Sequence, residues 1–591
     1  MIFPYKYKLE TAQKFIFAFL MIFAVLYSMW LKNDNVYDFQ NYHYYNAFAF
    51  LNNRLNYDIV PATVNGFFNP LLDLPLYFLV DWFNDYPVII FGIQGLWFGL
   101  LLILVFKICS LMFDFSRPEN LIYFIFVALF ITTGRAIMPQ IGSSTNEIAI
   151  NAIDLWGLYL LFKMLKFPKN QTTNTFIAAG FIIGCALGLK PTSVCPALVS
   201  GIMLICCADK IKNPIKNISI YALCGFLGFM LIHGWFMWQY WQLYGNPFFP
   251  FLNGIFHSPY MDNFNYTDNK WVLPFWQTLL APYIWYFDTE FEPEGMLGYQ
   301  FLVYCTINYV FLLYLILSRK LNKFRSKNIL LFAISIFLFF SFLFWQQLFA
   351  IMRYLGIIEV LFAFFSVAIV QQIAKKPVSY FILFLFFIPF VLLNRFNYWD
   401  LHNRDPLKKF VDVEQFNFPP NTLIKLYGRK LSFLVPIYAK NRPDIRAMGY
   451  YHDCSFSKNM CINGKGSDFA ERGEFRKMRN EIEKNHTGPV VIFFDDAHFI
   501  PEDVLKKLGD PDTEKKYKKC AKNNKNTQCD NKYHIFESDI LFISDLEGKL
   551  CRLLDYNLTY DSRVHICMNK DLFGIPEDEY IEVQKHGIEE Q

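Results

Sequence analysis

The run VIIFGIQGLWFGLLLILVFK, residues 88–107, decides the class of this protein. None of its residues is charged before the final lysine, and a helix needs about 20 apolar residues to cross roughly 30 Å of hydrocarbon. Residues 15–31 and 329–350 form comparable runs without charge. Such segments are too long and too apolar for the core of a soluble domain, so we expect the chain to span a membrane.

The composition of the whole chain agrees with these runs. Of 591 residues, 54% are hydrophobic and only 18% are charged, whereas soluble proteins carry about 25% charged residues. The apolar residues gather before residue 394 into about eleven expected spans, which predicts a mainly α-helical membrane protein. The spans are residues 15–31, 88–113, 121–138, 149–165, 175–189, 194–208, 218–238, 297–317, 329–350, 356–370 and 378–393. Only Lys190 and Pro191 separate the fifth from the sixth, so one kinked helix is an alternative there.

The distribution of positive charge predicts the orientation. With a cytoplasmic N-terminus, the expected inner loops hold about three times as many Lys and Arg residues as the outer loops, and cytoplasmic loops of membrane proteins carry such an excess. No small-residue cleavage site follows the first run, so we interpret it as an uncleaved anchor. An odd number of spans then places the C-terminal segment in the periplasm of a bacterial inner membrane.

Long segments on the outer side divide the chain further. We expect a transmembrane domain over residues 1–394, with outer loops at 32–87 and 239–296, and an extracytoplasmic α/β domain over residues 395–591. Both loops are rich in acidic and aromatic residues. Long loops in compact proteins are usually functional, so these two are where we expect the site.

The C-terminal segment has the pattern of a soluble domain. Residues 423–426, 489–494 and 540–543 are strand candidates, and residues 501–508 are a helix candidate that begins with proline. Six of the 13 cysteines lie here: Cys454, Cys461, Cys520, Cys529, Cys551 and Cys567. An even number of cysteines on the oxidising side of a membrane predicts disulfides, with the pairing open.

Asp38 is the strongest candidate for a catalytic residue. It lies shortly after the first run, in the stretch DNVYDFQNYHYYNAFAF (residues 34–50). A carboxylate among aromatic rings at a membrane surface can serve as a general base. The alternative is that Asp38 caps a helix over residues 39–51, because aspartate is a preferred N-cap residue.

An aspartate shortly after the first span, in a long first outer loop followed by many spans and a terminal outer domain, resembles the GT-C glycosyltransferases, such as the protein O-mannosyltransferases and the bacterial aminoarabinose transferase. The short motifs are most similar to uncharacterised bacterial members. The motifs are NYHYYNAFAFLNNR (41–54), FNPLLDLPLY (68–77), GLKPT (188–192), YGNPFFPFLNGIFHSP (244–259) and RYLGIIE (353–359). The resemblance implies a first-loop aspartate, here Asp38, as catalytic base and a polyprenyl-phosphate-linked sugar as donor. No acidic pair of the metal-binding type adjoins Asp38, so no metal or other cofactor is expected as the default, with a divalent metal left open.

Further residues are candidates for substrate binding. Lys190 and Arg353, with Tyr354 beside it, lie at outer span ends where cations can bind a lipid phosphate; the alternative is that they reach to the headgroup layer. Glu359 lies in the same span as Arg353. His43 is a possible proton shuttle, although an offset of five residues places it off the helix face of Asp38. Five loop residues complete the set. Turn formation is the alternative for the two in the first loop, and the five are Asn69 and Asp73 in the first loop and Asn246, His257 and Asp268 in the second.

The expected function is transfer of a sugar from the polyprenyl-phosphate donor to an acceptor glycan, lipid or protein on the outer face, with membrane lipids and no nucleic acid as partners. A transporter or flippase of lipid-linked glycans is an alternative that predicts ionisable residues in mid-span. A non-catalytic scaffold with a periplasmic binding domain is a second alternative, but it leaves the two acidic aromatic loops unexplained.

Overall fold

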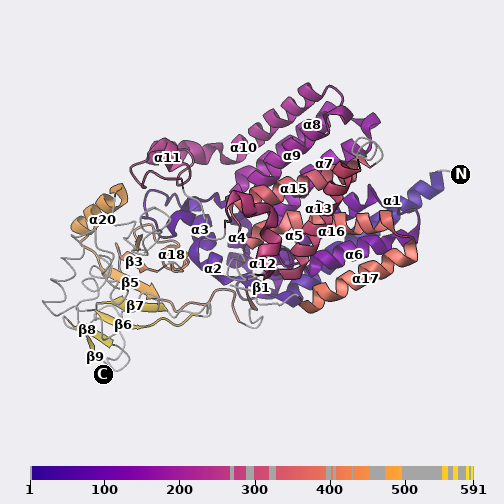
Figure 1. Cartoon of the computed structure of the whole chain (residues 1–591). Helices are drawn as coiled ribbons and strands as arrows, with labels where there is room; N and C mark the ends of the chain where they lie inside the picture. The colour runs from indigo at the N-terminus through magenta and orange to yellow at the C-terminus, as the bar shows by residue number, and fades with distance from the viewer. Residues whose placement is uncertain are drawn as a thin grey trace. The chain divides into compact units, whose positions relative to one another are not determined.

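The computed structural model describes residues 3–265, 272–287, 298–318, 328–393, 401–403, 408–428, 430–450, 473–495, 549–556, 564–569, 581–584 and 587–589. The chain divides into two compact units, whose elements Figure 1 labels along the chain. Unit 1 comprises Met1–Asn35, Tyr86–Trp235 and Thr267–Leu407. Unit 2 comprises Val36–Asp85, Phe236–Tyr266 and Lys408–Gln591.

Unit 1 is built of helices. The long ones are α1 (Phe3–Leu31), α5 (Pro87–Ser110), α6 (Leu121–Thr132), α7 (Glu147–Lys166), α8 (Thr173–Leu189), α9 (Val194–Cys206), most of α10 (Pro214–Tyr244), α13 (Gly298–Leu317), α15 (Ile329–Leu348), α16 (Gly356–Ile373) and α17 (Lys376–Leu393). Short 3₁₀ turns join several of them: η4 (Pro118–Asn120), η5 (Met138–Gln140), η6 (Pro168–Asn170), η7 (Pro191–Ser193), η8 (Ala208–Lys210) and η12 (Met352–Leu355). Two further segments, η9 (Phe275–Leu280) and α12 (Ala281–Phe287), precede α13, and β1 (Asn33–Asn35) pairs antiparallel with β2 (Leu401–Asn403).

Several of these helices are fit to cross a membrane. Among the described residues, seven are long and apolar enough: Ala12–Leu31, Pro87–Ser110, Glu147–Lys166, Pro214–Tyr244, Tyr299–Leu317, Ile329–Leu348 and Met352–Ile373. Four apolar helices are shorter: Pro118–Thr132, Thr173–Leu189, Pro191–Cys206 and Lys376–Leu392. The structure thus supports a multi-pass membrane protein, and the count of eleven spans stays a prediction.

The fifth and sixth expected spans are two separate helices. Lys190 follows α8 with extended backbone angles (φ −147°, ψ 127°), and η7 and α9 come after it. The proline at position 191 explains the break, because its ring disfavours helical angles in the preceding residue. A glycine at position 184 lets α8 approach the backbone of α10, since a Cβ atom there would overlap the carbonyl of Gly225. Small residues permit such close helix contacts in membranes.

Unit 2 contains a seven-stranded sheet in the order β4-β3-β5-β7-β6-β8-β9. Its strands are β3 (Leu423–Tyr427), β4 (Arg446–Tyr450), β5 (Val490–Asp495), β6 (Leu550–Leu553), β7 (Val564–Met568), β8 (Ile581–Gln584) and β9 (Gly587–Glu589). β3 lies parallel to β4 and β5, with α18 (Leu434–Ala439) and α20 (Gly473–Asn485) between these strands in sequence. The strands expected at 423–426 and 489–494 are confirmed, whereas the elements expected at 501–508 and 540–543 lie outside the described residues.

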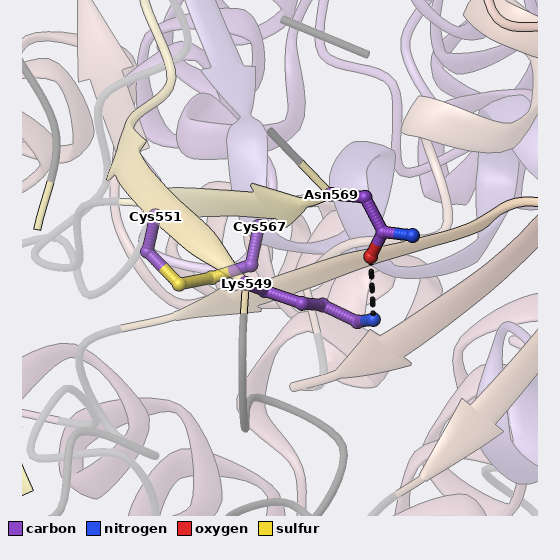
Figure 2. Close-up of a disulfide and its surroundings, with 4 residues drawn as sticks. All are labelled: Lys549, Cys551, Cys567 and Asn569. Carbon is purple, nitrogen blue, oxygen red and sulfur yellow. Dashed lines mark hydrogen bonds between the residues drawn. A yellow bond between two sulfur atoms is a disulfide. The ribbon is translucent and has the colours of Figure 1, made fainter. Parts of the chain in front are cut away.

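One disulfide joins two strands of this sheet. Cys551 of β6 and Cys567 of β7 lie directly opposite each other and are bonded, next to a hydrogen bond from Lys549 to Asn569 (Figure 2). This pair confirms part of the disulfide prediction. The other four C-terminal cysteines lie outside the described residues, so their pairing stays a prediction.

The two segments expected as outer loops contain short helices and turns. Those in unit 2 are α2 (Val36–Asp38), the π-helix η1 (Phe39–His43), α3 (Tyr44–Leu51), η2 (Thr63–Phe67), η3 (Pro70–Leu72), α4 (Leu74–Phe83) and, in the second loop, α11 (Asn253–Phe256). The predicted helix over residues 39–51 is therefore interrupted by a π-turn.

A buried ion pair fixes the first loop to the sheet. Arg54 and Asp58 are 3% and 4% exposed, and the guanidinium donates to both carboxylate oxygens, Nε to Oδ2 at 2.7 Å and Nη2 to Oδ1 at 2.8 Å. Burial lowers the pKa of Arg54, but the hydrogen bonds and charge of Asp58 outweigh burial and leave this pKa raised. Arg54 also donates to the carbonyl of Ile445 at 2.5 Å, and the N–H of Ala447 donates to Asp58 at 2.8 Å.

The same contact extends the sheet by one residue. Ile59 pairs in parallel with Met448 of β4: its N–H donates to the carbonyl of Ala447 at 2.9 Å, and its carbonyl accepts from Gly449 at 2.8 Å. The edge of β4 is thereby covered by the loop.

We predict that Asp58→Asn destabilises unit 2 by about 3–5 kcal/mol, because the substitution leaves the Arg54 charge buried without a counter-charge. Thermal unfolding of the purified full-length protein in detergent measures the change. Asp81→Asn is the matched control: it breaks the Lys440–Asp81 pair, in which the lysine side chain is 42% exposed, and should cost at most about 1 kcal/mol. Equal losses of stability in the two variants would contradict the larger contribution that we assign to the buried Arg54–Asp58 pair.

Candidate functional site

Asp38 lies inside a helical segment and not at its start. The segment begins at Val36, and Asp38 has helical backbone angles (φ −67°, ψ −36°) and makes no side-chain capping bond to η1. The alternative that Asp38 is an N-cap is therefore wrong. Its side chain is buried, with 3% exposure, which is unusual for an aspartate.

The π-helix changes the relation of His43 to Asp38. An α-helix would turn residues five apart onto different faces, but a π-helix hydrogen-bonds residues i and i+5. Since η1 covers Phe39–His43, His43 follows Asp38 by one hydrogen-bonded turn. The expectation that the offset of five separates them assumed an α-helix and is corrected here.

His43 forms a pair with Asp73, another residue singled out from the sequence. Its Nδ1 lies 2.6 Å from Oδ1 of Asp73, and the two side chains are 3% and 4% exposed. Asp73 lies between η3 and α4, so the second helical stretch of the loop delivers the carboxylate. With an ionised carboxylate, which can only accept, a neutral imidazole in this contact donates from Nδ1 and keeps the lone pair on Nε2. This is the arrangement by which an aspartate orients a histidine for proton transfer.

Acceptor atoms on this segment lack donors. In the described part of the chain, no hydrogen-bond partner reaches the buried Nε2 of His43 or Oδ1 of Asn46. The amide orientation of Asn46 is fixed, because its Nδ2 donates to the carbonyl of Asn65 at 2.8 Å. His43 and Asn46 are three residues apart, on one helix face. Oδ1 of Asn41 is a third such acceptor. Buried polar atoms are normally satisfied, so this face calls for a ligand that donates hydrogen bonds.

Aromatic rings surround the pair. The ring of Tyr42 lies 4.1 Å from that of His43 between centroids, and Tyr44 and Tyr77 are 5.3 Å apart. Burial raises the pKa of Tyr44 well above its usual value and that of Tyr77 to about 12. Both hydroxyls are therefore neutral at ordinary pH.

The C-terminal segment holds the π-helix in place. The N–H of Phe433 donates to the carbonyl of Gln40 at 3.1 Å, and the buried hydroxyl of Ser432 contacts the carbonyls of Gln40 and Asn41. A π-turn shifts the helical pairing, and carbonyls displaced from the α-helical ladder need other donors. The turn before α18 supplies them.

We predict that Ser432→Ala loosens the π-segment by about 1–3 kcal/mol, the cost of leaving a buried carbonyl without its donor. Hydrogen–deuterium exchange with mass spectrometry should show faster uptake across residues 36–51. Ser432→Thr keeps the hydroxyl and should retain most of the protection. Unchanged uptake in the alanine variant would mean that the π-segment is held without this hydroxyl.

The asparagines of the loops organise their own turns. Asn69 accepts from the N–H of Leu71 at 3.0 Å and caps η3, so the turn alternative applies to it. Asn246 is fully buried, donates to the carbonyl of Phe251 at 2.9 Å and accepts from the N–H of Phe248 at 2.9 Å. His257 ends α11 with a left-handed backbone (φ 54°). Asp268 lies outside the described residues, and sugar binding by these residues stays a prediction.

The expected phosphate-binding cations lie in unit 1. Nζ of Lys190 donates to Oε1 of Glu147 at 2.5 Å and to the carbonyl of Thr145 at 2.9 Å, so its charge is matched by a carboxylate. Tyr354 lies between the two cations, with its ring 5.9 Å from Nζ of Lys190 and 5.3 Å from the guanidinium carbon of Arg353. The three side chains form one group at the N-terminal end of α16.

Glu359 has a backbone role. Its carboxylate is fully buried and accepts the N–H groups of Arg135, Ala136 and Ile137 at 2.9, 3.1 and 2.9 Å. Gly134 makes room, because a Cβ atom there would overlap the carboxylate. Both oxygens are therefore engaged in holding the connection between α6 and α7, which weakens the case for substrate binding.

Sequence reasoning missed three buried carboxylates: Asp58, Glu147 and Asp154. The last two lie on α7, where Glu147, Asn151 and Asp154 recur at helical spacing. That spacing places them on one face and is the signal that could have found them. For Asp58, the spacing of four residues from Arg54 was a signal for the ion pair, whereas its backbone partner is nearly 400 residues away in sequence and could not be foreseen.

Among the described residues, no group of three or more His, Cys, Asp or Glu side chains could hold a metal ion. Compared with known proteins, the chain matches no family model, no curated protein and no solved structure. The resemblance to the GT-C glycosyltransferases therefore rests on the motifs of the sequence alone.

Proposed function

We propose that this protein is a membrane glycosyltransferase that moves a sugar from a polyprenyl-phosphate carrier to an acceptor hydroxyl. The observation that carries the proposal is the buried polar face of residues 36–51. Asp38, the His43–Asp73 pair and the open acceptor atoms of His43 and Asn46 lie on this segment or against it. Carboxylates and acceptors without donors suit a ligand rich in hydroxyl groups.

In the proposed reaction, Asp38 is the general base. Its carboxylate takes the proton of the acceptor hydroxyl while the hydroxyl oxygen bonds to the anomeric carbon of the donor sugar. The bond between that carbon and the phosphate oxygen breaks, and polyprenyl phosphate leaves with the electron pair. Nε2 of His43, oriented by Asp73, accepts a hydrogen bond from a sugar hydroxyl and keeps the acceptor in position.

Arg353 is the proposed contact for the phosphate group, because arginine offers a planar, permanently charged donor set for phosphate oxygens. Lys190 is the weaker candidate, since Glu147 already neutralises it. Tyr354 holds both cations through its ring.

The proposal needs the transmembrane domain and the orientation expected from the positive charges: eleven spans, a cytoplasmic N-terminus and a periplasmic C-terminus. A reporter that is active only in the periplasm should be active when fused after Gln591 and silent when fused at Lys323. A cytoplasmic signal from the C-terminal fusion would overturn the orientation and the outer-face location of the chemistry.

We predict that Asp38→Asn lowers transfer by about 10²-fold or more, because the amide keeps the size of the side chain but cannot take a proton. Mass spectrometry of glycolipids and glycans from cells with and without the protein identifies the product, which then serves as the measure. Asp81→Asn, at the exposed Lys440 pair, is the control and should keep full activity at equal membrane abundance. A fully active Asp38→Asn protein would move the search for the base to His43 and Asp73.

A second candidate function is transport of a lipid-linked glycan. One observation favours it: Asp154 and Glu359 are buried carboxylates within helices long enough to span the membrane, as a transport path predicts. The same mass spectrometry separates the two functions. Loss of a transporter leaves the glycosylated lipid intact on the inner side, whereas loss of a transferase leaves the acceptor without its sugar.

A further inference from the structure

Asp154 is a buried acidic residue that the proposed transferase reaction does not use. It lies in α7, about 10 Å along the helix axis from Glu147 by helical rise, and is 1% exposed. The helix is one of those fit to cross a membrane. A charge at such a position is costly unless it is matched.

Asp154 has no cationic partner among the described residues. Lys190 neutralises Glu147 on the same face of α7, and Glu147 acts on Asp154 as a like charge. Within the described residues, no Lys, Arg or His forms an ion pair with Asp154. Cys195 and Tyr221 also lie close enough to feel its charge, and neither is a cation. Lys190 is engaged by Glu147, and Arg353 lies on the other side of Tyr354, so Asp154 has no counter-charge of its own among the described residues.

The hydrogen bonds of Asp154 are also incomplete. Ser193, in the break between α8 and α9, donates its hydroxyl to Oδ2 at 2.7 Å. Oδ1 is buried, and no described residue donates to it. Oγ1 of the neighbouring Thr192 likewise has no partner among the described residues. Glu359 is the contrast: three backbone N–H groups satisfy its carboxylate, whereas Asp154 has one neutral donor and an open oxygen.

We propose that Asp154 binds a monovalent cation, either a proton or a sodium ion, at the broken α8–α9 helix. A single uncompensated negative charge requires a single positive one. Divalent cations take six or more oxygen ligands and usually several carboxylates, and this site offers one. Interrupted helices supply hydroxyl and backbone oxygens for such ions in membrane proteins. The proposal stands apart from the transferase reaction and holds whether or not that function is correct.

Infrared spectroscopy of the purified full-length protein in sodium-free buffer tests proton binding. A protonated carboxyl group gives a carbonyl stretch distinct from that of a carboxylate, and Asp154→Asn should remove one such band. Asp114→Asn is the matched control: Asp114 also accepts a serine hydroxyl, from Ser116 at 2.5 Å, but it is exposed, and these hydrogen bonds lower its pKa. That variant should leave the band unchanged.

A sodium titration at constant ionic strength, with choline as the replacement, distinguishes the two cations. If sodium is the ligand, it should remove the band at fixed pH and raise the Tm of the wild-type protein but not of Asp154→Asn. If the proton is the ligand, sodium should have no effect on the band or on the Tm. The band should then either disappear only as the pH rises or remain over the whole pH range tested.

Ser193→Ala serves if Asp154→Asn does not fold. This variant removes the hydrogen bond from Ser193 to Oδ2 of Asp154. If Asp154 binds a proton, the frequency of its band should shift, because hydrogen bonding weakens the carbonyl stretch. If Asp154 binds sodium, the gain in Tm from sodium should be smaller. Two results together would overturn the proposal: neither variant alters a carboxyl band of the wild-type spectrum, and sodium does not raise the Tm of the wild-type protein.

Discussion

The buried pair of Arg54 and Asp58 is the constraint on which unit 2 depends. Both charges are withdrawn from water, so each needs the other and also the backbone groups that satisfy their remaining hydrogen bonds. Those groups belong to Ile445 and Ala447, which enter β4. An ion pair between neighbours in the first loop thus requires a strand that comes much later in the chain. Neither the loop nor the strand edge can adopt its observed form alone.

The same reasoning applies to the segment that carries the candidate site. A π-turn is uncommon because it disturbs the regular helical ladder, and here Ser432 and Phe433 bind the carbonyls of Gln40 and Asn41. The π-helix η1 places His43 one hydrogen-bonded turn after Asp38, and Asp73, at the start of α4, bonds to His43. The chemistry proposed for the first loop is therefore supported by backbone contacts from the C-terminal segment.

Unit 1 shows three ways of burying a carboxylate. Glu147 has a lysine, Glu359 has three backbone N–H groups, and Asp154 has one serine hydroxyl. The first two are complete, because a counter-charge or several strong donors offset the loss of water. The third is incomplete, and for that reason it is the one to which we assign a cation. The difference among these three carboxylates supports this assignment more strongly than the burial of Asp154 alone.

The sequence by itself determined the membrane class, because length and absence of charge are properties of a single contiguous run. It also predicted β3 and β5, from the strand patterns at residues 423–426 and 489–494, but it left one kinked helix open as the alternative to the break at Lys190. It selected Asp38, His43 and Asp73 by residue type and place. Only the tertiary structure decided that His43 bonds Asp73, that Asp38 does not cap a helix, and that Glu359 serves the backbone. These outcomes depend on which distant donors and acceptors meet once water is excluded, and no local pattern in the chain encodes that meeting.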